Sequence, residues 1–170
     1  MKSNIKDEKI NQQILLGLMK AESLFGKSVT SHLRLINETQ NSSSDLSFVD
    51  SIRTINFKKG LTIAEVYEKL KDNPIKNGNT FTYLTIHELG HTLGQIHKEL
   101  YDNFLELTKT KGFDKNVLIK EFGNNVISIN NEISKGELFA DAFADCVLNK
   151  EKASKTGKLI PEFLKKQGII

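Results

Sequence analysis

The sequence predicts an α+β fold that is mainly helical, with a small sheet beside one of the longer helices. Most of the 170 residues fall into segments whose apolar residues recur every three or four positions, which is the period of a helix with one buried face. The few strand-like runs lie before residue 60. With 38% apolar and 26% charged residues, the chain is expected to form a single domain, residues 1–170, around its own core.

Charge and composition exclude several classes of function. The formal net charge is +3, and the 24 basic and 21 acidic side chains are spread evenly, so no surface for nucleic acid is expected. We find no secretory signal and no apolar run long enough for a membrane span. We therefore expect no membrane association, and we expect a cytoplasmic location. The one cysteine, Cys146, cannot form an internal disulfide and is expected to be a buried thiol.

Residues 1–48 are expected to form an N-terminal helical segment. An amphipathic helix is expected at residues 5–25. Its apolar positions are Ile10, Ile14, Leu18, Leu15 and Met19. Residues 28–37 fit a strand or a short helix equally poorly, and His32 among them is expected to be an ordinary surface histidine. Residues 37–50 are rich in Ser, Asn, Thr and Gln, which predicts an exposed loop.

Residues 50–150 are expected to hold a strand and most of the remaining helices. A short strand is expected at residues 51–58, and as an edge strand beside the helix that begins near residue 80 it could bind a peptide backbone or simply pack. Thr62-Ile63-Ala64-Glu65 is a capping box that begins a helix. Helical spacing then runs without a clear break from about residue 80 to residue 110. Further helices are expected at residues 114–122 and 134–148 and from Pro161 onward.

The segment His87-Glu88-Leu89-Gly90-His91 has the H-E-x-x-H pattern of zinc metallopeptidases. Four residues apart in a helix, the two histidines lie on one side, about 6 Å apart along the axis, so both rings can reach one zinc ion at about 2.1 Å. Glu88 is rotated about 100° from His87 and can face a water molecule on the metal as a general base.

Two glycines in the same helix need a physical reason. Gly90 and Gly94 each weaken a helix by about 1 kcal/mol relative to alanine. Close approach of another backbone or of a substrate would explain their presence.

A catalytic zinc ion needs a third protein ligand, and His97 is the first of two candidates. It completes H-E-x-x-H-x-x-G-x-x-H, the metzincin string. In an unbroken helix, however, His97 would lie about 120° around from His91 and about 9 Å further along. Metzincins also have a methionine turn below the metal, whereas Met1 and Met19 both precede the motif. We therefore favour a position on the helix flank for His97.

Glu137 is the second candidate and the one that we favour. Glu137, Asp141 and Asp145 recur every four residues and form one acidic stripe. Like charges at this spacing destabilise a helix unless a cation lies against them. We expect Glu137 to bind zinc, Asp141 to accept the free N–H of a ligand histidine, and Asp145 to be exposed. The alternative is that Glu137 only closes a capping box with Ser134.

Two strings together carry a family resemblance. Thr85-Ile86-His87-Glu88-Leu89-Gly90-His91, followed by Glu137-x-x-Ala140-Asp141-x-Phe143-Ala144, resembles the gluzincin-type peptidase domains of phage minor head (MuF-type) proteins, which are similar to the catalytic domain of anthrax lethal factor. The resemblance implies a zincin-like fold with zinc on His87, His91 and Glu137, and a virion-associated location if the chain is part of a phage protein. The ImmA/IrrE peptidases share a similar second string and would imply a repressor protein as the substrate.

One position departs from the phage-type pattern. There a tyrosine commonly precedes the ligand glutamate and could support the oxyanion, whereas residues 128–131 here read Ser-Ile-Asn-Asn. Asn130 is the candidate donor in its place, with Tyr83 and Tyr101 as alternatives. The sequence thus predicts a zinc-dependent metalloendopeptidase that acts on a protein or peptide. Its catalytic core is expected in residues 50–150, with the small sheet beside the metal-binding helix. The alternative is a metal-stabilised binding or structural module that hydrolyses nothing.

Overall fold

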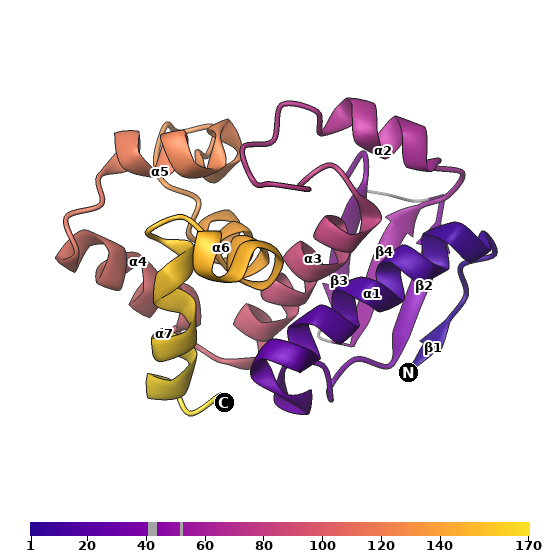
Figure 1. Cartoon of the computed structure of the whole chain (residues 1–170), viewed down its shortest axis with the longest axis horizontal. Helices are drawn as coiled ribbons and strands as arrows, with labels where there is room; N and C mark the ends of the chain where they lie inside the picture. Colours follow the sequence, from indigo (N-terminus) through magenta and orange to yellow (C-terminus); the bar gives the residue numbers. More distant parts are fainter. Residues whose placement is uncertain (41–43, 52) are drawn as a thin grey trace.

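The computed structural model describes residues 1–40, 44–51 and 53–170. In these residues the strands are β1 (Lys2–Ser3), β2 (Leu35–Thr39), β3 (Ser47–Ser51) and β4 (Thr54–Lys58). The helices are α1 (Glu8–Phe25), α2 (Ile63–Lys69), α3 (Phe81–Ile96), α4 (Leu100–Thr110), α5 (Lys115–Phe122), α6 (Lys135–Asn149) and α7 (Ile160–Lys166). The expected α+β class is therefore confirmed (Figure 1).

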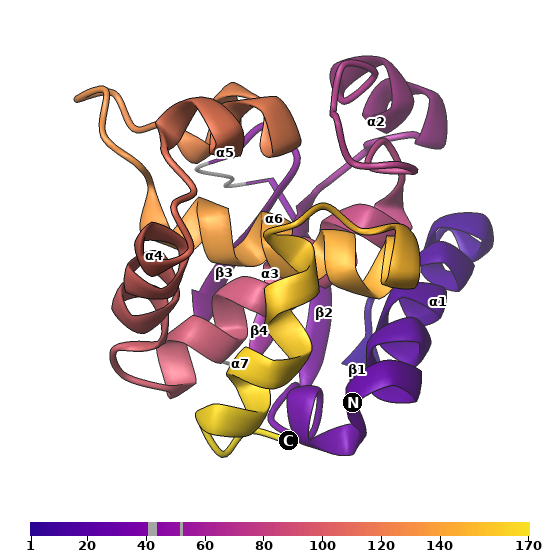
Figure 2. The same cartoon turned by 60° about the vertical axis from the view of Figure 1, so that its left-hand side comes forward.

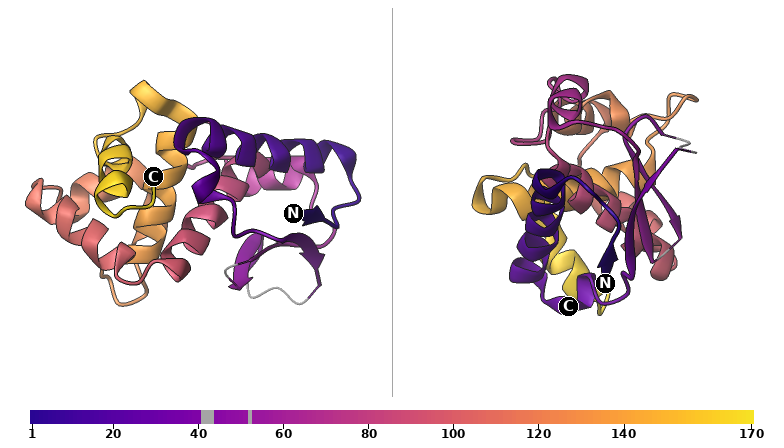
Figure 3. Two further views of the ribbon diagram at one scale, coloured as in Figure 1. Left: turned by 90° about the horizontal axis from the view of Figure 1, so that it is seen from below. Right: turned by 90° about the vertical axis from the view of Figure 1, so that its right-hand side faces the viewer.

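The molecule has the sheet at one end and a group of helices at the other. The sheet and α1 lie at one end, α4, α6 and α7 gather at the opposite end, and α3 lies between them (Figure 3). Of the helices in the described residues, none is long and apolar enough to cross a membrane.

The four strands form one mixed sheet in the order β1-β2-β4-β3. β2 pairs in parallel with β1 and β4, and β3 pairs antiparallel with β4. The strand expected at residues 51–58 is therefore an inner strand, and the prediction of an edge strand there is wrong. Among the described residues β3 pairs only with β4, so β3 is an edge strand, and it packs against α3.

The loop expected at residues 37–50 is shorter than predicted. β2 extends to Thr39 and β3 begins at Ser47. Phe48 and Val49 are the only large apolar residues of β3, so its sequence carries little strand pattern. Residues 41–43 of the expected loop, and residue 52 of the expected strand, lie outside the described residues.

The described part of the N-terminal segment, residues 1–40 and 44–48, contributes to the main core. Asp7 caps α1 by accepting a hydrogen bond from the Ile10 backbone N–H at 3.0 Å. The buried positions of α1 are Ile10, Ile14, Gly17, Leu18, Ala21 and Phe25. Leu15 and Met19 are exposed, so the apolar stripe is narrower than expected. This segment also supplies β1 and β2, so it contains strands beside the expected helix.

The long helix expected from residue 80 to residue 110 is broken. α3 is capped by Thr80 and ends at Ile96, Glu99 adopts a left-handed backbone with φ 66°, and α4 then begins. Neither glycine nor proline marks the break. The bend instead places the Tyr101 ring against Gly94, where a Cβ atom would lie 2.0 Å from the ring carbon Cζ. A tertiary contact therefore accompanies the break.

α3 is packed tightly between α1 and α6 (Figure 2). On one side, Gln13 of α1 accepts a hydrogen bond from the Phe81 backbone N–H at 3.2 Å. On the other side, a Cβ atom at Gly90 would lie 2.9 Å from Cα of Ala140. Gly90 thus permits the close approach of another backbone, which is one of the two reasons expected.

On α6, Cys146 is buried as predicted, and burial raises the pKa of its thiol to about 12.

Candidate metal centre

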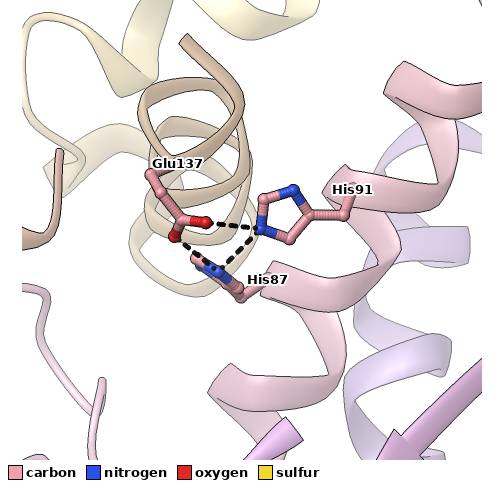
Figure 4. Close-up of side chains that lie close together, drawn as sticks. All are labelled: His87, His91 and Glu137. Carbon is pink, nitrogen blue, oxygen red and sulfur yellow. Dashed lines mark hydrogen bonds and ion pairs between the residues drawn. The ribbon is translucent and has the colours of Figure 1, made fainter. Parts of the chain in front are cut away.

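Two helices bring the candidate ligands together. α3 carries His87 and His91, one turn apart, and α6 carries Glu137 in its first turn. The Ser134 side chain makes no capping hydrogen bond, so the alternative capping box does not form. Glu137 instead points at the two imidazoles (Figure 4).

The side chains of His87, His91 and Glu137 form a triangle. The two histidine Nε2 atoms are 3.1 Å apart, Nε2 of His87 lies 3.2 Å from Oε2 of Glu137, and Nε2 of His91 lies 3.2 Å from Oε1 of the same carboxylate. A tetrahedral ion with ligands at about 2.0 to 2.1 Å separates those ligands by about 3.3 Å. Each of these three spacings is close to that value, so His87, His91 and Glu137 could hold a metal ion.

Asp141 fixes the orientation of the His87 ring. Its Oδ1 lies 2.8 Å from Nδ1 of His87 and accepts a hydrogen bond from the Tyr83 hydroxyl at 2.7 Å. Its Oδ2 accepts a hydrogen bond from the Asn125 side-chain amide at 3.3 Å. The carboxylate is fully buried, and it needs such partners to be stable there. With Nδ1 held in this way, Nε2 of His87 faces Glu137.

Tyr101 contacts the back of the His91 ring. Its hydroxyl donates to the backbone carbonyl of His91 at 3.1 Å, and the same oxygen lies 3.4 Å from Nδ1. The Tyr83 hydroxyl is similarly on the Nδ1 side of His87, at 3.5 Å. Both tyrosines, which were alternatives for the oxyanion donor, therefore contact the histidines on the side opposite the converging Nε2 atoms.

The charges around the triangle favour a cation. Burial alone would lower the pKa of His87, but the carboxylates of Asp141 and Glu137 raise it well above its usual value. Burial would raise the pKa of Glu137, but hydrogen bonds from His87 and His91 hold it far below its usual range. Burial and the nearby Asp141 raise the pKa of Tyr83, so its hydroxyl stays protonated. The group therefore places negative charge where the imidazoles meet.

Glu88 lies beside the triangle and takes no part in it. Its carboxylate is 5% exposed, and its Oε1 accepts a hydrogen bond of 2.7 Å from the Ser47 hydroxyl. Ser47 lies on β3 and was missed from the sequence, because its segment was predicted to be a loop. Sequence periodicity carries no signal that would join a serine at an edge strand to a helix 41 residues away.

A cleft of about 420 Å³ opens over these residues. The triangle residues and Glu88 are part of its lining. Its apolar lining consists of Leu46, Phe48, Val49, Leu70 and Leu84, and its other polar lining consists of Ser44, Ser47, Tyr83, Gln95 and Asn125. No lysine or arginine is among the described residues that line the cleft.

Two of the predicted site residues lie outside the cleft lining. His97 caps the C-terminal end of α3 and does not belong to the metal group. The reason expected for this position, an unbroken helix, is wrong, because α3 ends before His97. Asn130 lies in an exposed turn and is not among the residues that line the cleft, whereas Asn125, which the sequence did not single out, is.

Two residues expected at the surface are buried or half-buried. Asp145 is 4% exposed and accepts a hydrogen bond from the Ser154 backbone N–H at 2.8 Å, so it holds the turn after α6. Nε2 of the half-buried His32 lies 2.8 Å from the Thr92 hydroxyl on the far side of α3. Burial, together with the nearby His97, lowers the pKa of His32 to about 4.

No protein-family model, curated protein or solved structure matches the chain. The resemblances to gluzincin-type and ImmA/IrrE peptidases stay predictions from the two sequence strings. The candidate centre thus rests on the geometry of its own side chains.

Proposed function

We propose that this chain is a zinc-dependent metalloendopeptidase of the gluzincin type. The observation that carries the proposal is the convergence of His87, His91 and Glu137 at a cleft that also contains the buried carboxylate of Glu88. Two imidazoles and one carboxylate are a donor set that suits zinc. A zinc ion held by them would supply Lewis acidity for a scissile carbonyl and would lower the pKa of a bound water toward 7.

The side chains around the cleft support distinct roles. Glu88 takes a proton from the attacking water and passes it to the leaving amine as the peptide bond breaks. Asp141 holds the His87 imidazole in one tautomer, and the Tyr101 hydroxyl supports His91. Asn130 is assigned no role, since it does not line the cleft.

The cleft walls support a peptide as the substrate. β3 is the edge strand next to α3, and Ser47, Phe48 and Val49 of this strand line the cleft. An extended peptide can add to such an edge through backbone hydrogen bonds. The apolar lining favours a peptide with an apolar side chain next to the cleaved bond.

Glu88→Gln tests the proposed chemistry. The Gln side chain has the shape of Glu, so the zinc content of the variant should equal that of the wild type. Cleavage of a protein substrate should fall about 10²- to 10⁴-fold with the loss of the base. A set of candidate protein substrates is incubated with both forms, and the products are identified by mass spectrometry. Identical behaviour of the two forms on every substrate would refute the peptidase and favour the metal-stabilised module, which has no use for a base.

The third ligand is tested by zinc stoichiometry. Glu137→Ala should lose bound zinc, and His97→Ala is the matched control that should keep it. The expected difference follows from the triangle, to which His97 does not belong. Loss of zinc in the His97 variant alone would contradict the assignment.

A further inference from the structure

The Glu88 carboxylate has a single anchor, which lies on the edge strand. In the described part of the chain, the hydrogen bond from the Ser47 hydroxyl to Oε1 is the only hydrogen bond or ion pair that this carboxylate makes. Ser47 is 7% exposed and Glu88 5% exposed. A carboxylate buried to this degree is unstable without a partner, so the hydroxyl decides how Glu88 lies.

The Ser47 hydroxyl donates its hydrogen bond to Oε1 of Glu88 and not to Oε2. Glutamate has three rotatable side-chain bonds, so an unanchored carboxylate samples several directions. A hydrogen bond on Oε1 selects one of them, and both residues line the cleft. Because a general base must lie within hydrogen-bond reach of the proton that it accepts, this selection bears directly on catalysis.

A hydroxyl is chemically suited to this position. It donates to a carboxylate and can accept from a carboxylic acid, whereas a lysine or a backbone N–H can only donate. The contact between Ser47 and Glu88 can therefore persist while Glu88 carries the proton between water and leaving group.

The strand that holds Ser47 is itself rigidly supported. Ser47 lies opposite Phe57 in the pairing of β3 with β4. The Phe57 ring packs on Phe81, in the first turn of α3, with ring centroids 5.5 Å apart. The position of Ser47 is thus tied to the same helix that carries Glu88.

We propose that Ser47 is a positioning residue that holds the Glu88 carboxylate toward the cleft before and after proton transfer. This inference rests on the proposed peptidase function. It assigns a second task to β3, which supports the substrate backbone and also holds the base.

The first experiment compares Ser47→Ala with Ser47→Thr, which keeps the hydroxyl. All proteins are loaded with zinc, and equal zinc content is verified. Because a misplacement of about 1 Å can cost about 100-fold in rate, kcat of Ser47→Ala should fall about 10- to 100-fold, with KM nearly unchanged. Ser47→Thr should recover most of the loss. A wild-type kcat in Ser47→Ala, or an equal loss in Ser47→Thr, would overturn the proposal.

A second readout needs no cleavage. Melting temperatures of the full chain with excess zinc are measured for Ser47→Ala, Glu88→Ala and the double variant. If the two side chains interact, the fall in melting temperature of the double variant should be smaller than the sum of the two single falls. The difference should be at least about 3 °C, as expected for a hydrogen bond to a charged group. Additive losses would overturn the proposal. If the wild type cleaves no substrate, the proposed function fails, and this cycle alone decides whether Ser47 holds Glu88.

Discussion

The contact of Gly90 with Ala140 sets how close the two ligand-bearing helices can lie, so Gly90→Ala should disturb the metal group. The added Cβ would lie 2.9 Å from Cα of Ala140. Carbon atoms pack at about 3.5 to 4.0 Å, so α3 and α6 must separate by roughly 0.6 Å or more. Metal ligands tolerate displacements of only about 0.2 Å. We expect zinc affinity to fall at least about 10-fold, the lower limit typical of a perturbed ligand environment.

The same substitution has two opposing effects on stability. Overpacking costs about 1 to 3 kcal/mol, and alanine in place of glycine in a helix returns about 1 kcal/mol. The metal-free protein should therefore lose about 0 to 2 kcal/mol, which calorimetry in EDTA detects as a fall of several degrees at most.

Gly136→Ala is the matched control for Gly90→Ala. Its Cβ would lie 3.5 Å from the Tyr101 ring and 3.7 Å from the His91 ring, which are ordinary contacts. Zinc affinity, measured by competition with a chromophoric chelator, should stay at the wild-type value in this variant. Equal zinc affinity in Gly90→Ala and the wild type would refute the reasoning that this contact fixes the separation of the helices.

Three further predictions concern the partner of His87, the metal and pH. Asp141→Asn keeps the volume but removes the charge that orients His87, so zinc affinity should fall about 10- to 100-fold in the same competition assay. In a sample whose free zinc concentration is about 100 times the dissociation constant for zinc, removal of the metal by EDTA should lower the free energy of unfolding by about 2.7 kcal/mol. Calorimetry should show this as a fall in melting temperature of roughly 5 to 10 °C. The pKa of His32 falls from 6.5 to about 4 on folding, so the unfolded chain binds more protons between these values and stability should decrease as pH falls through that window. Because His32 is half-buried, solvent screening limits the loss to about 1 to 2 kcal/mol.

Each of these predictions has a control. His32→Gln should lose less stability than the wild type between pH 6.5 and pH 4, and equal urea-unfolding profiles would contradict the burial argument. Glu137→Ala should show no shift with EDTA, and a full shift would mean that zinc acts elsewhere. A wild-type affinity in Asp141→Asn would show that the contact does not orient His87.

Elements with complete local signals could be predicted from the sequence. α5 begins after Asp114 and ends at Gly123, and α2 follows the capping box of Thr62, as expected. Local signals failed where packing decides the structure. The break after α3 accompanies the contact of Tyr101 with Gly94, and β3 is held by its pairing with β4 despite a weak pattern.

The residues of the candidate site also differ in whether the sequence carries a local signal for them. The positions of His87 and His91 follow from helix geometry, and the acidic stripe pointed to Glu137 because like charges on one face need a cation. Ser47 and Asn125 come from an edge strand and from a short 3-10 turn. Neither has a periodic pattern, and only the folded chain brings them to Glu88 and Asp141.

The origin of the third ligand on a second helix has a consequence for the chain as a polymer. An ion held by His91 and Glu137 would cross-link the chain and close a loop that contains all of α4 and α5. Closing a loop of this size removes conformational entropy from the unfolded chain, by about 4 kcal/mol for a permanent link. Unlike a disulfide, this link would form and open with the supply of metal. Protection of α4 and α5 from hydrogen exchange should then follow the metal concentration.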